Sequence, residues 1–215
     1  MTTRMMTMIE KGSLIVYSGP SGVGKGTILK ALLAPAGPLV LSVSATTRAP
    51  REGEVNGREY HFVSREQFEQ MVKEGDMLEY AEYNGNYYGT PKSFVERQLE
   101  MGNDVILEIE TKGAAQIKKL CPEAVLIFVM PPSYQELETR LLGRGTETAE
   151  QCAGRLKAAL REIEAAENYD FIIVNDTVEN ARLQLMKAVS AGKLICRINK
   201  NKIYEVLKNV KTGNE

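Results

Sequence analysis

The chain has 215 residues, of which 43% are hydrophobic and 26% are charged. This is the composition of a soluble globular protein, and it argues against a disordered chain, a collagen or a disulfide-stapled miniprotein. At about 150 residues per domain, the length predicts between one and two domains. The formal net charge of −1 gives no overall attraction to nucleic acid or to an acidic membrane, so a site for a polyanion must come from a local cluster of cations.

Cysteine and histidine are too few and too scattered for common metal or disulfide frameworks. Cys121, Cys152 and Cys196 are an odd count, and none lies in a Cys-x-x-Cys pair. We expect free thiols in a reducing compartment rather than disulfides or a zinc site. The single histidine, His61, lies in the alternating stretch 58–63 and is expected to be a structural strand residue.

We expect no targeting segment in this sequence. Residues 1–12 carry one arginine and one lysine but lack the apolar core of a signal peptide. No apolar run is long enough to span a bilayer. We therefore expect a cytoplasmic protein.

The first elements predict the opening of a parallel α/β sheet. The apolar run Leu14–Ser18 predicts a strand, and a glycine-rich turn over residues 19–26 follows it. A helix is expected next, with Ile28, Leu29, Leu32 and Leu33 on one face. Residues 39–43 predict a second strand, which ends in a polar segment over residues 44–51. Strand, glycine turn and helix in this order are typical of α/β proteins.

Residues 52–88 predict an inserted lobe of antiparallel strands. Strand-like stretches at 59–63 and 77–83 flank a short helix. Ser64 is its expected N-cap, and Phe68, Met71 and Val72 are its expected buried face. Glycine-rich turns separate these pieces, so we expect a lobe of the same domain rather than a second domain.

The remaining elements complete the predicted core. A helix is expected from Pro91 to about Met101, and helical structure over most of residues 133–167. The nearly continuous apolar runs 105–109, 125–130 and 171–174 predict buried parallel strands. An amphipathic helix is expected from Glu179, and the basic tail 200–211 is interpreted as a solvated helix end rather than a nucleic-acid patch.

The segment Gly19-x-x-x-x-Gly24-Lys25 matches a phosphate-binding loop. Its glycines allow backbone N–H groups to surround an oxyanion, and the following helix adds its positive end. A plain glycine turn would not require a lysine at this spacing. The usual Ser or Thr after the lysine is Gly26 here, and the hydroxyl comes one place later, on Thr27. Thr27 could therefore contact Mg²⁺ directly or through water.

Two arginines follow the second predicted strand. Arg48 and Arg51 lie where open α/β sheets bind ligands, beyond the carboxyl end of a strand. Arginine forks bind phosphate well, so these residues are either a second anion site or solvated surface cations. The residues themselves leave both interpretations open.

At this point the chain resembles the guanylate kinase family. The stretch from Ser42 through Arg48, Arg51, Gly53-Glu54-Val55-Asn56-Gly57 and Tyr60-x-Phe62 follows the family signature. Further matches are Leu78–Glu82, Gly85–Thr90, Pro131–Ser133, Gly143–Thr148 and Ile173–Asp176. They occur in the family order over most of the chain and are jointly very specific.

The resemblance implies transfer of the γ-phosphoryl group of ATP to GMP, giving ADP and GDP, with Mg²⁺ and within purine nucleotide metabolism. It implies that Arg48, Arg51, Tyr60 and Tyr88 hold the GMP phosphate, and that Ser44, Glu79 and Thr90 recognise guanine. The implied ATP-binding residues are Gly19, Pro20, Ser21, Gly22, Val23, Gly24, Lys25, Gly26, Thr27, Arg140, Arg144 and Asn175. The implied catalytic residues are Lys25, Arg48, Arg144 and Arg155.

The chain departs from the family pattern after its inserted lobe. The family usually has Asp where Glu108 and Glu110 stand, and Gln where Lys112 stands. Glu110 is still expected to reach GMP or the nearby arginines, and Glu108 to act near Mg²⁺ through water.

The implied fold is an α/β P-loop NTPase-type parallel sheet flanked by helices, with an inserted mixed α/β NMP-binding lobe and a helical lid. In one guanylate-kinase-like domain we expect the core at 12–47, 91–134 and 165–199, the lobe at 48–90, the lid at 135–164 and a C-terminal tail at 200–215. ATP and GMP are the expected partners, with no nucleic acid, membrane or obligate protein partner.

Three other functions compete with this one. A kinase for another acceptor, such as a ribose phosphate, would keep the phosphate loop but would not need Ser44, Glu79 and Thr90 together. A non-catalytic guanylate-kinase-like scaffold that binds phosphorylated peptides typically loses the intact loop and the lid arginines, whereas this chain keeps Lys25 and Arg144. A general ATP-binding regulator is the third alternative.

Overall fold

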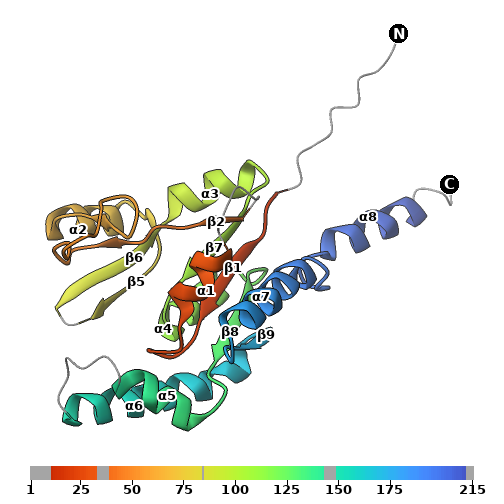
Figure 1. Ribbon diagram of the computed structural model, residues 1–215. Helices are drawn as coiled ribbons and strands as arrows, with labels where there is room; N and C mark the ends of the chain where they lie inside the picture. Colours follow the sequence, from red (N-terminus) through yellow and green to blue (C-terminus); the bar gives the residue numbers. More distant parts are fainter. Residues whose placement is uncertain (1–10, 33–38, 84, 143–148, 212–215) are drawn as a thin grey trace. The chain divides into compact units, whose positions relative to one another are not determined.

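The computed structural model describes residues 11–32, 39–83, 85–142 and 149–211 (Figure 1). They form two compact units, which are described separately. Of the described residues, the loop unit comprises 15–32, 109–142 and 149–211, and the lobe unit comprises 11–14, 39–83 and 85–108. The expected division into core, lobe, lid and tail stays a prediction.

Parallel strands form the centre of the loop unit. β1 (Leu14–Ser18) pairs in parallel with β8 (Val125–Met130), and β8 pairs in parallel with β9 (Phe171–Val174). The side chains of β1 and β8 are almost all buried, as the continuous hydrophobic runs predict. The prediction of a buried strand is wrong for most of β9, where Ile173 is buried but Ile172 is 55% exposed, because β9 lies at the edge of the sheet. Because parallel strands end at one edge of a sheet, the segments after β1 and β9 come together there.

The loop unit also contains several helices. In chain order they are α1 (Lys25–Leu32), α4 (Thr111–Leu120), α5 (Tyr134–Leu142), α6 (Ala149–Glu164), the 3₁₀ turn Ala165–Asn168, α7 (Val178–Gly192) and α8 (Lys200–Lys211). Figure 1 shows α1 and α7 side by side, and α7 also packs on β8 and β9. The helices α5 and α6 pack through a small core of Leu137, Leu141 and Ala159. A parallel sheet flanked by helices is the predicted α/β arrangement.

The lobe unit holds a second, smaller sheet. Its strands lie in the order β4 (His61–Phe62), β3 (Ala45–Thr46), β6 (Asn86–Pro91) and β5 (Met77–Tyr83). The β3–β6 and β5–β6 pairs are antiparallel, but β3 and β4 are parallel. The prediction of purely antiparallel strands is therefore wrong at β4, because the long loop 47–60 lets the chain return in the same direction.

The other elements of the lobe unit follow the sequence pattern. β2 (Leu39–Leu41) pairs in parallel with β7 (Asp104–Glu108), and α3 (Lys92–Glu100) begins directly after β6. α2 (Arg65–Lys73) starts at Ser64, whose side chain accepts the N–H of Gln67 in a capping box. Phe68 is 1% exposed and stacks on Tyr87, whereas Met71 and Val72 are only half-buried, so the predicted buried face of this helix is confirmed at Phe68 alone.

His61 is a strand residue, as predicted. It lies in β4, and its N–H donates to the carbonyl oxygen of Ser44 at 2.9 Å. Cys196 is an exposed free thiol, and the side chain of Cys152 lies outside the described residues.

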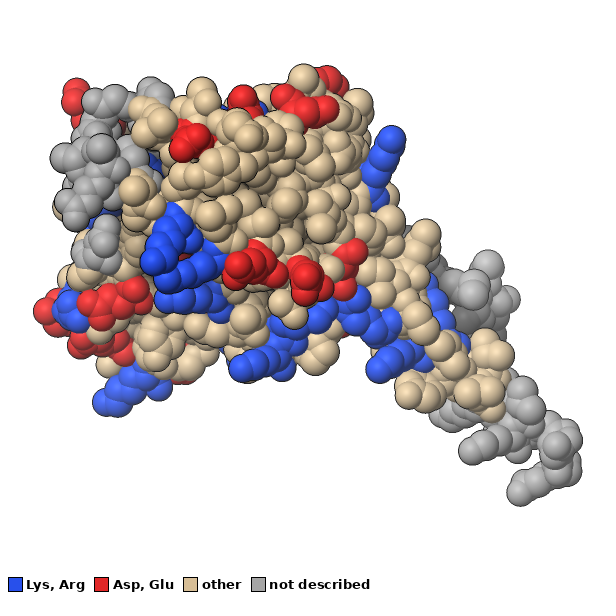
Figure 2. Space-filling model, turned by 90° about the horizontal axis from the view of Figure 1, so that it is seen from below, with Lys and Arg blue, Asp and Glu red and all other residues tan. Residues whose placement is uncertain are grey.

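The surface carries interspersed charges. On the face drawn in Figure 2, Lys and Arg side chains alternate with Asp and Glu, in keeping with the net charge of −1. The C-terminal α8 exposes Ile203 and Leu207 together with Lys200 and Lys202, as expected for a solvated helix end. Within the described ranges, none of the helices is both long and apolar enough to cross a membrane.

Arg197 anchors the segment between α7 and α8. Its guanidinium donates to the carbonyl oxygens of Pro122 at 3.0 Å and Ala124 at 2.9 Å, and it pairs with Asp170. Asp170 also accepts the N–H of Leu126 at 2.8 Å. Because these bonds tie the start of β8 to the segment before β9, we expect Arg197→Ala to lower the free energy of unfolding by about 1–3 kcal/mol.

Thermal and denaturant unfolding measure this loss, at roughly 2–4 °C in Tm for each kcal/mol. Arg182→Ala is the matched control, since Arg182 pairs with Glu179, a side chain exposed at 68%. We expect the control to leave stability nearly unchanged. Equal stability of the two variants would contradict the anchoring role.

Candidate functional site

The predicted phosphate loop joins β1 to the N-terminus of α1. Gly24 has φ of +95°, and a Cβ there would lie 2.6 Å from Nδ2 of Asn175. Only glycine satisfies both the left-handed backbone and this close approach. The N–H groups of Thr27 and Ile28 return to the carbonyl oxygen of Gly24, so α1 begins at the loop. This is the helix-terminus geometry that binds phosphate.

Lys25 lies at the first position of α1 with its ammonium group turned back over the loop. Its Nζ donates to the carbonyl oxygens of Gly19 at 2.6 Å and Pro20 at 3.3 Å. The side chain is half-buried, and its charge also acts on Glu162. Lys25 thus holds a positive charge beside backbone groups that are suited to phosphate.

Two side chains from distant segments hold the loop by one carbonyl group. Asn175, directly after β9, donates from Nδ2 to the carbonyl oxygen of Val23 at 2.7 Å. Arg140 of α5 donates to the same oxygen at 3.3 Å and to the carbonyl oxygen of Asn175 at 3.1 Å. The structure therefore shows both residues bracing the loop, and their predicted contacts with ATP stay predictions.

Helix α6 contacts the loop through Ser21. Arg155 donates to Oγ of Ser21 at 2.8 Å, and the N–H of Ser21 donates to Oε2 of Glu162 at 3.2 Å. Burial raises the pKa of the Glu162 carboxyl, while the Ser21 N–H and the charge of Lys25 lower it in part. Arg144, which is also predicted to act on ATP, lies outside the described residues.

The departure at Gly26 is not forced by packing. A Cβ at this position would meet no atom within 4 Å apart from the helix's own neighbouring backbone. The hydroxyl of the next residue, Thr27, lies on an exposed position in the first turn of α1. Thr27 therefore places a hydroxyl one residue beyond the usual position of the Ser or Thr that follows the lysine.

Three of the four predicted GMP-phosphate residues gather in the lobe unit. Arg48 follows β3, and its guanidinium carbon lies 5.4 Å from the ring centre of Tyr60. The rings of Tyr60 and Tyr88 meet edge to face with centres 5.9 Å apart. Burial, followed by the charges of Tyr88 and Glu108, raises the pKa of Tyr60. These side chains form a cationic and hydroxyl-bearing cluster that suits a phosphate.

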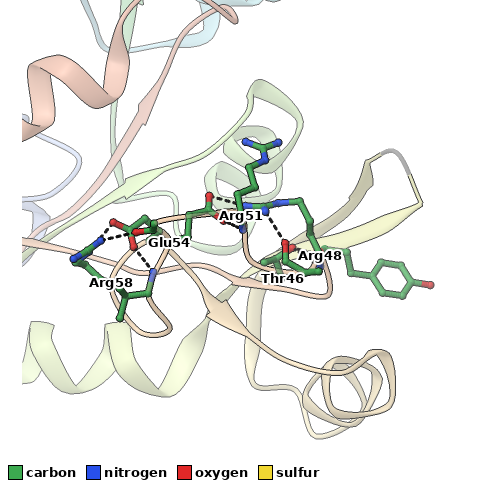
Figure 3. Close-up of polar contacts among 10 residues, drawn as sticks. Thr46, Arg48, Arg51, Glu54 and Arg58 are labelled. Atoms are coloured by element: carbon green, nitrogen blue, oxygen red, sulfur yellow. Dashed lines mark hydrogen bonds and ion pairs between the residues drawn. The ribbon is translucent and has the colours of Figure 1, made fainter. Parts of the chain in front are cut away.

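Arg51, the fourth residue, is linked to Arg48 by a carboxylate (Figure 3). Oε1 of Glu54 accepts from Nη2 of Arg48 at 2.9 Å, and Oε2 accepts from the backbone N–H of Arg51 at 2.8 Å. Burial lowers the pKa of Arg48, but the hydrogen bonds and charges of Glu54 and Tyr88 together outweigh it, so the pKa is raised. The structure thus brings both arginines to one carboxylate.

A buried polar pair forms the predicted guanine-recognition site. Glu79 of β5 is 7% exposed and faces Thr90 of β6, which is 1% exposed. Oγ1 of Thr90 donates to Oε1 of Glu79 at 2.7 Å. Thr90 and Tyr88 are two residues apart on β6 and therefore point to the same side of the strand. Ser44 lies before β3 in the same unit.

The residues that depart from the family pattern have different surroundings. Glu108 is half-buried at the end of β7, and its charge acts on Tyr60. Glu110 is exposed directly before α4, and its charge acts on Glu162. Lys112 is exposed in the first turn of α4. Their predicted roles toward GMP and Mg²⁺ stay predictions.

Sequence reasoning missed two carboxylates that touch these sites. Glu54 lies in the family motif, close to Arg51 in sequence, and this closeness could have indicated a contact between them. The role of Glu162 could not be found from the sequence. A glutamate on a polar helix is usually solvated, and its partner Ser21 is 141 positions away.

Comparison with known proteins shows the family to which the chain belongs. The family profile described as guanylate kinase matches residues 11–192. The guanylate kinase of Clostridioides difficile (strain 630) is 49% identical over 200 residues, which cover 93% of this chain and 98% of that protein. The Listeria monocytogenes enzyme of the same name is 52% identical over 85% of this chain and 89% of its own length.

A solved structure gives the same result. The crystal structure of guanylate kinase from Anaplasma phagocytophilum matches with a TM-score of 0.73 at 35% identity, covering 91% of this chain and 95% of that chain. The match therefore extends over fold and sequence together. With a phosphate loop in one unit, a buried Glu79–Thr90 pair in the other and relatives of this similarity, the chain belongs to the guanylate kinase family.

Proposed function

We propose that the protein transfers the γ-phosphoryl group of ATP to GMP, giving ADP and GDP, in the purine nucleotide metabolism of the cytoplasm. The observation that carries this proposal is the buried Glu79–Thr90 pair, in which Thr90 lies two residues from Tyr88 on β6. This arrangement supports binding of a purine base beside its 5′-phosphate. ATP and GMP are its only proposed partners.

Guanine is the base that a buried carboxylate selects. Its N1–H and N2–H₂ donors lie side by side, and one carboxylate can accept from both. Adenine presents a lone pair at N1, which would face the negative charge of Glu79. Thr90 already donates to Glu79, which orients the carboxylate, and the hydroxyl of Ser44 can donate to O6. Sites that pair buried polar groups can discriminate by ~10⁴ or more.

The loop unit supplies the proposed ATP site. The loop N–H groups and Lys25 bind the β- and γ-phosphates, and Arg155 is placed at Ser21 to act on the same charge. Asn175 and Arg140 hold the loop in shape through Val23. Arg144 is proposed as a further catalytic arginine from the resemblance alone.

The donor set of the loop fits a magnesium ion that arrives with the nucleotide. Mg²⁺ prefers oxygen ligands and is usually held by substrate phosphates and one or two protein oxygens. Thr27 presents an exposed hydroxyl beside the loop and would hold the ion directly or through a water. The bound ion supplies charge neutralisation of the phosphates.

Phosphoryl transfer from ATP to GMP requires that the two substrates are positioned, and it does not require a general base. The acceptor is a phosphate oxygen that is already ionised near neutral pH, so no side chain has to remove a proton. In-line transfer between two polyanions needs cations on both sides and exclusion of water. In this proposal Lys25 and Arg155 neutralise the phosphates of ATP, and Arg48 and Arg51 neutralise the phosphate of GMP.

An ADP-release assay tests the proposal. The reaction contains ATP and Mg²⁺ with GMP, AMP, CMP, UMP or no acceptor, and a parallel series omits the metal ion. We expect turnover with GMP, far less with the other acceptors and almost none without Mg²⁺. Turnover with a different acceptor alone would favour a kinase of other specificity. Absence of turnover together with binding of a phosphorylated peptide would favour a scaffold.

A further inference from the structure

Glu54 contacts both arginines of the proposed GMP-phosphate site, as Figure 3 shows. Its two carboxylate oxygens have different partners: the guanidinium of Arg48 and the backbone N–H of Arg51. The N–H of Glu54 in turn donates to the carbonyl oxygen of Arg51 at 3.1 Å, which closes a tight turn. One side chain therefore fixes the distance between the segments that carry the two cations.

The Arg48–Glu54 pair is not an ordinary surface ion pair. The two side chains are only 14% and 17% exposed. Arg48 is held on its other sides as well, because Nη1 donates to the carbonyl oxygen of Ala49 at 2.7 Å and the guanidinium carbon lies 5.7 Å from the ring centre of Phe62. Solvent screening and side-chain freedom, which weaken exposed pairs, are both reduced here.

The backbone that leads to Arg48 is fixed too. Its N–H donates to Oγ1 of Thr46 at 3.1 Å, and that hydroxyl donates to the carbonyl oxygen of Tyr87 at 2.9 Å. In contrast, Figure 3 shows the guanidinium of Arg51 extending away from Glu54, and Arg51 is exposed. Glu54 thus positions the Arg48 side chain and the Arg51 backbone while leaving the Arg51 guanidinium directed elsewhere.

From this arrangement we propose that Glu54 is a positioning residue for recognition of the GMP phosphate, acting through Arg48 and Arg51. A long arginine side chain loses rotamer freedom when it binds a phosphate, and that loss weakens binding. Glu54 removes much of this freedom beforehand. The proposal rests on the proposed function, since it assumes that GMP is bound here by its phosphate.

Net charge alone predicts the opposite change in GMP affinity when Glu54 is neutralised. Glu54 brings a negative charge to a site for a phosphate dianion, so Glu54→Gln would strengthen GMP binding if only net charge mattered. Positioning predicts weaker binding, because an amide holds a guanidinium less firmly than a carboxylate does. The direction of the change therefore separates the two explanations.

The experiment measures Kd for GMP and for guanosine by calorimetry, together with kcat and KM, in the wild type and in Glu54→Gln. We expect Kd and KM for GMP to rise about 10-fold, with kcat changed less than about 3-fold and guanosine binding unchanged. Guanosine lacks the phosphate, so a general loss of lobe structure would weaken both ligands, whereas loss of positioning weakens GMP alone.

Glu59→Gln is the matched control. Glu59 lies in the same loop and makes the same two kinds of contact, accepting from the N–H of Val55 at 2.8 Å and from Arg58 at 2.7 Å. It is expected to leave GMP binding unchanged. Tighter or unchanged GMP binding in Glu54→Gln, or equal weakening of guanosine, would overturn the proposal. A wild type that binds GMP no better than guanosine would instead overturn the proposed function.

Discussion

Replacement of Lys25 by methionine is expected to lower kcat at least about 10²-fold. The ammonium group lies 2.6 Å from the carbonyl oxygen of Gly19 and is thus held over the phosphate loop. At this place it can neutralise the charge that moves between the β- and γ-phosphates during transfer. Methionine keeps the length and the helix propensity of the side chain but removes the charge.

Steady-state kinetics with ATP and GMP measure the effect, and thermal unfolding shows whether the variant is folded. Lys30→Met is the matched control, because Lys30 lies exposed in the last turn of the same helix. We expect the control to keep the rate of the wild type. A Lys25→Met enzyme within about 3-fold of the wild-type kcat would refute the role assigned to this lysine.

The second large effect is expected at the guanine site. In Glu79→Gln, the ratio of kcat/KM for GMP to kcat/KM for AMP should fall by about 10² or more. The glutamine keeps one acceptor oxygen, but its amide group turns donors toward the donors of guanine. Because Glu79 is 7% exposed, little water is present to replace the lost hydrogen bond.

The measurement is the pair of specificity constants, with Tm recorded for each variant. Glu82→Gln serves as the control, since Glu82 lies on the same strand but is exposed. Its ratio should equal that of the wild type. If Glu79→Gln keeps the wild-type ratio while it remains folded, Glu79 does not recognise the base.

Local patterns predicted the core well because burial constrains them strongly. The continuous apolar runs give β8 and β9 their observed ends, Val125–Met130 and Phe171–Val174. At the lobe, the predicted strand 59–63 is reduced to His61–Phe62. Glu59 is drawn into the preceding loop by the N–H of Val55, a contact that alternation of polar and apolar residues does not show.

In the candidate sites too, local motifs could be predicted from the sequence, whereas contacts between distant segments could not. The phosphate loop is contiguous in sequence, so its motif alone identifies it. The contacts that shape it come from α5, α6 and the end of β9, and no periodicity encodes such distant pairs. The resemblance supplied the residues of the GMP site, but only the structure shows that Glu54 connects Arg48 with Arg51.

The bracing of Val23 has a consequence for synthesis of the chain. The strand, the glycine turn and the helix of the loop emerge early from the ribosome, but Asn175 is translated 152 positions after Val23. Until then a nascent chain has the whole motif without the side chain that holds its backbone in place. The proposed nucleotide site therefore forms late, and under the proposed function ATP can assist folding only of a nearly finished polypeptide.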